Sequence, residues 1–96
     1  MNDVFLDGRA FHSKEALHAS LQTALSLPEH YGKNLDALFD CLTEPTRQLH
    51  LHLIHRDSIV AQLGNYGEAF LQVLDAAVVE NHQLQLTIDE NDSNQL

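Results

Sequence analysis

The 96-residue chain has one cysteine, no tryptophan, two prolines and only five lysine and arginine residues. The single thiol, Cys41, excludes an intrachain disulfide, and a lone cysteine at the edge of an apolar helix is usually a small core residue. No apolar run is long enough to span a membrane, and the first residues include acids where a secretory signal would be hydrophobic. We therefore expect one small domain with a cytoplasmic location.

Motifs of the common enzyme classes are also missing. The sequence has no nucleophile elbow, phosphate-binding loop or dinucleotide fingerprint. A catalytic interpretation would have to use Asp36 and Asp40 as paired carboxylates, with His30 as the base. Both aspartates fall on one exposed helix face, without an apolar pocket that would separate their pKa values. We therefore expect no enzymatic activity.

Negative charge is what the chain has in excess. Its 14 acidic residues and five basic residues give a net charge of −9 at pH 7. Nucleic acid backbones are bound by basic patches, so this balance argues against a nucleic acid partner. It suits a basic partner, although acidity can also serve solubility alone. Seven histidines add positive charge as the pH falls toward 6.

Hydrophobic periodicity predicts three strands and four helices. Alternating apolar residues indicate strands at about residues 3–7, 48–54 and 83–88. Apolar residues at helical spacing indicate helices at about residues 14–25, 35–43, 57–63 and 67–80.

Residues that cap or break helices support these boundaries. Ser13 and Asp57 are predicted N-caps, and Asn81 is a predicted C-cap. Pro45 ends the second helix, and a turn is expected at residues 64–65. The polar residues 90–96 are expected to form a frayed C-terminal tail.

Strands that alternate with helices imply a parallel sheet. Each strand has one apolar side, so one face of the sheet should be buried and the other largely open. If the helices cover one face, right-handed crossovers give the strand order 1-2-3. The prediction is a two-layer α/β domain of residues 1–89 with a three-stranded parallel sheet. Its expected core residues are Leu35, Leu38, Leu42, Leu51, Leu53, Phe70, Leu74, Leu84 and Leu86.

The most informative stretch is residues 27–44, LPEHYGKNLDALFDCLTE. A loop rich in helix breakers leads directly into a helix with an apolar leucine stripe. Asp36 and Asp40 are four residues apart and lie on one side of that helix. They form either a solvated face favoured by the helix dipole or an acidic recognition surface beside the loop.

The segment LPEHYGKNLDALFDCLT, residues 27–43, closely resembles the signature of the barstar family, approximately LPxYYGxNLDALWDCLT. Barstar is the intracellular inhibitor of the secreted ribonuclease barnase. A shorter match is Leu71-Gln72-Val73, and the order of elements fits the family along nearly the whole chain. The resemblance implies the same two-layer α/β fold, and a basic ribonuclease as a 1:1 protein partner without a cofactor.

The resemblance also implies roles for individual residues. Asp36 and Asp40 match the two helix aspartates that enter the active site of the enzyme, and Asn34 and Gly32 match loop positions at the interface. His30 stands where the family has a contacting tyrosine, and Phe39 replaces a tryptophan. The expected partner-binding residues are therefore Gly32, His30, Asn34, Asp36, Phe39 and Asp40.

The sequence departs from the family pattern at the periphery of this surface. It diverges after Thr43, where Pro45 falls near a second interface tryptophan. Ala76 falls where barstar has a contacting glutamate. A retained acidic centre with a changed periphery fits a family member with a different cognate nuclease or with weaker binding.

A metal site is the remaining candidate. His50 and His52 lie on one face of the predicted strand 48–54, and His55 follows. Two imidazoles at this spacing could bind zinc with a third group. The sequence shows no CxxC or HExxH motif and no acidic third ligand placed to complete the set, so we expect a solvent-facing polar surface and no metal.

Two hypotheses follow. The first is a barstar-like inhibitor or immunity protein that blocks a basic ribonuclease with its acidic helix. The alternative is a protein-binding module of the same fold whose partner is not a nuclease. Both exclude a nucleic acid or a membrane as the partner.

Overall fold

The three predicted strands form one parallel sheet. This computed structural model describes residues 2–89, and in it β1 (Asn2–Asp7), β2 (Leu49–Ile54) and β3 (Leu84–Asp89) pair in the order β1-β2-β3. In the register, Val4 pairs with Leu51 and Leu51 pairs with Leu86. Paired residues project to the same face, so each strand contributes its apolar positions to one side. The predicted order 1-2-3 is confirmed.

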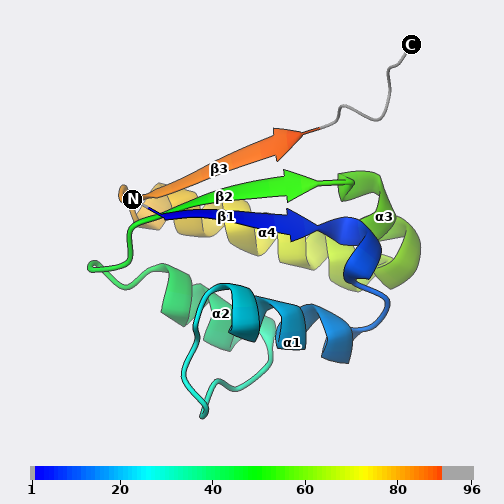
Figure 1. The fold of residues 1–96 in the computed structure, drawn as a ribbon, viewed down its shortest axis with the longest axis horizontal. Coiled ribbons are helices and arrows are strands. Elements are labelled where there is room, and N and C mark those ends of the chain that lie inside the picture. The colour runs from blue at the N-terminus through cyan, green and yellow to red at the C-terminus, as the bar shows by residue number, and fades with distance from the viewer. Residues whose placement is uncertain (1, 90–96) are drawn as a thin grey trace.

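The helical segments are η1 (Gly8–Ala10), α1 (Lys14–Ala24), α2 (Leu35–Leu42), α3 (Arg56–Leu63) and α4 (Asn65–Glu80). Figure 1 shows the helices gathered on one side of the sheet, with α3 at the end where β1 and β2 terminate. The opposite face of the sheet is left uncovered, which confirms the predicted two-layer α/β arrangement. No helix within residues 2–89 is long and apolar enough to cross a membrane.

The core lies between the sheet and the helices. The alternation in β2 buries Leu51 and Leu53, while His50 and His52 on its other side are half-buried. Two predicted core residues, Leu35 and Leu86, are only half-buried. Leu35 is the first residue of α2 and Leu86 is on an edge strand, so each has neighbours on fewer sides. The other predicted core residues are buried: Leu38, Leu42, Leu51, Leu53, Phe70, Leu74 and Leu84.

Two local predictions near α3 were wrong. Asp57 is not its N-cap, because α3 begins at Arg56 and the preceding His55 takes a left-handed conformation (φ 57°) without a side-chain cap bond. The helix α4 begins two residues earlier than expected, at Asn65. Gly64 adopts φ 59° and reverses the chain in a single residue, a conformation that glycine takes without steric cost. The short helical segment η1 was not predicted from the sequence.

The predicted caps at the other ends are present. The Ser13 hydroxyl oxygen accepts a hydrogen bond from the Ala16 N–H at 3.1 Å, as an N-cap of α1 should. Asn81 occupies the C-cap position of α4 and its N–H donates to the Ala77 carbonyl at 2.8 Å. The proposed tail at residues 90–96 lies outside the described residues.

Asn81 does more than end a helix. Its side chain is buried, and its Nδ2 group donates to the carbonyl oxygens of Leu42, Glu44 and Arg47 at 2.9, 3.2 and 3.1 Å. Its Oδ1 accepts from the Gln83 N–H at 2.9 Å. The side-chain amide of Asn81 therefore links the segment after α2 to the residues just before β3.

Replacing Asn81 should destabilise the fold. Asn81→Ala would remove the donor of one buried carbonyl, that of Leu42, and of the part-buried carbonyls of Glu44 and Arg47. We expect the free energy of unfolding to fall by about 2–4 kcal/mol. Asn81→Asp should cost at least as much, because a carboxylate would face three carbonyl oxygens. The adjacent exposed variant His82→Ala is the control and should change stability by less than about 0.5 kcal/mol. Urea denaturation measures all three, and equal stability of Asn81→Ala and His82→Ala would contradict the assignment.

Candidate functional site

The helix α2 has an anchored side and an exposed side. Leu38 and Leu42 are both 0% exposed. Asp36 and Asp40 are exposed on the opposite side, and Phe39 is half-buried at the border and packs against the core. The helix cannot rotate without exposing its leucines, so the positions of the two carboxylates are fixed by the core.

The residues before α2 set its direction. Asn34 is the N-cap: its Oδ1 accepts from the Ala37 N–H at 2.7 Å, and its Nδ2 donates to the Gly32 carbonyl at 3.3 Å. Lys33, between them, has φ 57°. A Cβ on Gly32 would lie 3.3 Å from the Ala37 Cβ, so glycine lets the loop pass close to the helix start. The Asn34 side chain thus shapes this surface from within the chain, and its direct contact with a partner stays a prediction.

The loop and α2 enclose a shallow hollow of about 260 Å³. It brings together His30, Gly32 and Asp40 from the predicted binding set, and it also contains Glu44. Asn34, Asp36 and Phe39 are not part of its lining. The full lining is Pro28, His30, Tyr31, Gly32, Ala37, Asp40, Cys41 and Glu44. Two carboxylates at one small hollow favour a cationic side chain as its occupant.

Glu44 was missed in the sequence analysis. It is exposed just beyond the C-cap Thr43, four residues after Asp40. The repeat Asp36, Asp40, Glu44 is a signal at intervals of four residues that could have identified it. These three acids extend the negative surface along the whole length of α2.

A buried histidine holds the loop in place. His18 of α1 is 1% exposed, and its Nδ1 and Nε2 lie 2.7 Å from the hydroxyls of Tyr31 and Tyr66, respectively. Tyr31 is itself buried and is next to His30 in the loop, while Tyr66 belongs to α4. A neutral imidazole can donate to one hydroxyl and accept from the other, so both ring nitrogens are satisfied. The loop before α2 is therefore tied through Tyr31 to α1 and, through His18, to α4.

Burial shifts the acid–base equilibria of this cluster. Desolvation lowers the pKa of His18, because the charged imidazolium is disfavoured away from water. Desolvation also raises the pKa of Tyr31 and of Tyr66, so both hydroxyls stay protonated. This cluster was not predicted from the sequence, although His18 is next to Leu17 on the buried side of α1.

Cys41 does not have the surroundings of a nucleophile. It is half-buried in the wall of the hollow, and desolvation raises the pKa of its thiol. A thiol in this state carries little thiolate at neutral pH, and the thiolate is the reactive form.

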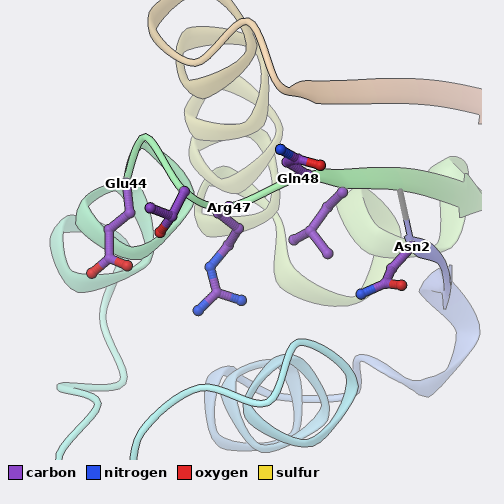
Figure 2. Close-up of a pocket in the computed structure, with 6 residues that line it drawn as sticks. Asn2, Glu44, Arg47 and Gln48 are labelled. Carbon is purple, nitrogen blue, oxygen red and sulfur yellow. The ribbon is translucent and has the colours of Figure 1, made fainter.

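A second hollow, of about 420 Å³, lies beside the segment that leads into β2. Figure 2 shows Arg47 projecting into it from that segment. The Arg47 Nη1 donates to the Leu25 carbonyl at 2.9 Å, which positions the guanidinium within the chain. Glu44 lines both hollows, so the acidic side of α2 borders on a hollow that contains a basic residue, Arg47.

Comparisons with known proteins give a consistent result. A family model described as "Barstar (barnase inhibitor)" matches residues 1–89. The chain is also 39% identical over 82 residues to a Bacillus subtilis (strain 168) protein named "Putative ribonuclease inhibitor YrdF". That alignment covers 83% of this chain and 89% of the relative.

The lowered pKa of His18 predicts a pH dependence of stability. The unfolded chain takes up this proton near pH 6.5, whereas the folded chain takes it up only at lower pH. The free energy of unfolding should therefore decrease as the pH falls below 6.5, by at most about 1.4 kcal/mol per pH unit from this one group. Urea denaturation between pH 7.5 and 5.0 measures the slope.

The matched variants are His18→Gln and His82→Gln. His18→Gln should lower stability at pH 7.5 and flatten the slope, because glutamine does not titrate. His82→Gln, at an exposed position, should keep the slope of the wild type. An unchanged slope in His18→Gln would show that other groups cause the acid sensitivity.

Proposed function

The chain belongs to the barstar family, and from this premise we propose that it binds a basic ribonuclease one to one and blocks the active site of that enzyme with α2. The observation that carries the proposal is the pair of exposed carboxylates, Asp36 and Asp40, on a helix whose other side is locked by two fully buried leucines. A rigid pair of negative charges resembles two phosphates of an RNA strand.

The proposed mechanism is substrate mimicry by carboxylates. Ribonuclease active sites hold phosphates with lysine, arginine and histidine side chains. Asp36 and Asp40 would occupy these phosphate positions through charge-assisted hydrogen bonds. A cationic side chain of the enzyme would enter the hollow beside Asp40 and Glu44, with His30 and Gly32 at its rim. The enzyme is then blocked without any chemical step.

The fixed geometry supports tight binding. The Asn34 cap and the hydrogen bonds from His18 to Tyr31 hold the loop against α2. A preorganised surface loses less conformational entropy on association than a mobile one. Phe39, packed at the edge of the core, would contribute apolar contact at the border of the interface.

We also propose that the protein is not an enzyme and that it acts in the cytoplasm. The family is one of inhibitors, and Cys41, with its raised thiol pKa, does not provide a nucleophile. An inhibitor that protects a cell from its own secreted ribonuclease acts where that enzyme is made, so we place the protein in the cytoplasm.

The changed periphery favours one alternative, a partner that is not a nuclease. His30, Phe39 and Ala76 differ from the residues that the family pattern has at these positions. A gene for a secreted basic nuclease next to the gene for this chain would support the first function. Capture of a protein without nuclease activity through Asp40 would support the alternative.

Asp40 should be the most sensitive position of the interface. Asp40→Ala would leave cationic groups of the enzyme desolvated and unpaired, and we expect binding to weaken by about 2–5 kcal/mol, mainly through faster dissociation. That range was established on complexes that include the barnase–barstar pair itself and is carried over as a family magnitude. Asp40→Asn should lose much of the same amount, because it keeps the shape and removes the charge.

The measurement is binding kinetics with barnase and with basic ribonucleases from secreted fractions. A thermal melt of each variant should show that the fold is retained, because Asp40 is exposed. Glu68→Ala, on the exposed side of α4, is the matched control and should bind like the wild type. If Asp40→Ala binds like the wild type and Glu68→Ala does not, α2 is not the recognition element.

Association should also depend on salt. The net charge of −9 should attract a basic enzyme over distances that salt shortens to about 8 Å at 0.15 M ionic strength. We expect the association rate constant to fall steeply between low salt and 0.15 M, while the dissociation rate constant changes less. Stopped-flow measurements separate the two. A salt-independent association rate would mean that the acidity serves solubility alone.

A further inference from the structure

The open face of the sheet carries a cluster that the acidic surface does not use. Asp3 and Phe5 of β1 pair in register with His50 and His52 of β2, and Thr87 of β3 pairs with His52. His50 and His52 lie on the side of β2 opposite to its buried leucines, and their register partners share that side. The helix α2 lies on the other side of the sheet (Figure 1).

We propose that this face holds a divalent transition-metal ion, with Asp3 Oδ1, His50 Nδ1 and His52 Nε2 as its ligands. The expectation that no acidic group completes the histidine pair was wrong about the placement of Asp3. The third ligand comes from a neighbouring strand, 47 residues before His50 in the chain, and the parallel pairing of β1 with β2 brings it there. Within residues 2–89, these three side chains are the one group of three or more potential ligands.

The distances fit a metal site. The Asp3 Oδ1 lies 3.0 Å from His52 Nε2 and 3.5 Å from His50 Nδ1. Ligand atoms around a tetrahedral zinc ion with bonds of about 2.0–2.1 Å are about 3.3 Å apart. The two measured distances lie on either side of that value. All three ligand atoms are within 4.8 Å of one another. Because a metal ion lies in the plane of each imidazole that binds it, one of the two stacked rings would turn out of the stack when the ion binds.

A neighbouring hydroxyl orients one of the ligands. The Nε2 of His50 is 2.7 Å from the Thr87 Oγ1. If this nitrogen donates its hydrogen to the hydroxyl, the lone pair of Nδ1 is left facing Asp3. Histidine ligands commonly use their second nitrogen in this way, and the hydrogen bond fixes both the tautomer and the direction of the ring.

The second histidine is held by stacking. The ring of His52 lies against Phe5, with centroids 4.4 Å apart and planes 13° apart. The His52 ring also stacks on His50, with centroids 4.0 Å apart and planes 25° apart. Both histidines are on the central strand, which is hydrogen-bonded on both edges. The backbone that carries both histidines is therefore rigid, and only the side chains have to turn when the ion binds.

The donor set selects the class of metal. Two imidazoles and one carboxylate suit Zn²⁺, Ni²⁺ or Cu²⁺, whereas Mg²⁺ and Ca²⁺ prefer oxygen ligands alone. The Asp3 side chain is 61% exposed, so the fourth position faces solvent and takes a water molecule. This explains why an aromatic side chain, Phe5, is 67% exposed on that face: it forms one wall of the site.

The test is calorimetric titration of Zn²⁺, and separately of Ni²⁺, into the metal-free, untagged full chain. We expect saturable binding of one ion per chain. His50→Gln, His52→Gln and Asp3→Asn should each weaken binding at least about tenfold, because each removes one ligand. His82→Gln is the matched control for a general histidine effect and should bind like the wild type.

A second pair of variants tests the orienting hydroxyl. Thr87→Val should weaken Zn²⁺ binding by about tenfold, and Thr87→Ser should restore it, because serine keeps the hydroxyl. Paramagnetic Ni²⁺ should broaden the amide resonances of Asp3, His50 and His52 while leaving those of α2 sharp. Thermal melts without metal check that each variant is folded.

The proposal is overturned if the wild type shows no saturable binding, or if His82→Gln weakens binding as much as His52→Gln. It is also overturned if Asp3→Asn and both histidine variants bind like the wild type. These titrations contain no ribonuclease, so their outcome is independent of the function proposed for α2.

Discussion

The burial of Leu38 and Leu42 is the constraint on which the proposed function depends. Both side chains are fully inaccessible, and α2 contacts α4 through the core. A helix of eight residues has little stability by itself in water, so its position comes from this packing. The same packing leaves Asp36 and Asp40 exposed with no freedom to turn inward. The packing of one side of this short helix thus determines where the charges on its other side lie.

The loop before α2 is controlled by polar contacts instead. The hydroxyl of Tyr31 reaches His18 inside the protein, and His18 reaches Tyr66 on α4. The Asn34 side chain then joins the loop to the first turn of α2 by hydrogen bonds to Gly32 and Ala37. Because burial disfavours the charged form of His18, the geometry of the loop is coupled to the protonation of a group inside the protein. The acidic surface therefore has an apolar support under α2 and a polar support under the loop.

Features that depend on residues close together in the sequence were predicted, and features that join distant residues were not. Strand alternation and helix spacing are local, so they gave the elements, the buried face and, with the handedness of crossovers, the strand order. The start of α3 was predicted wrongly, with Asp57 as its N-cap, because His55 adopts a left-handed conformation that no local pattern indicated. The His18 cluster and the placement of Asp3 beside His50 were missed for another reason. Both join residues on different elements, and their distances depend on strand register and helix packing.

The three carbonyl oxygens bound by Asn81 have a consequence for how such a protein can diversify. A main-chain carbonyl is the same in every residue, so the path of the segment between α2 and β2 is held without reference to its side chains. The exposed side chains of Pro45 and Thr46 can therefore be exchanged while the backbone stays in place. The rim next to the acidic helix is thus free to be remodelled for a new partner at little cost to folding, while the centre stays fixed by the core.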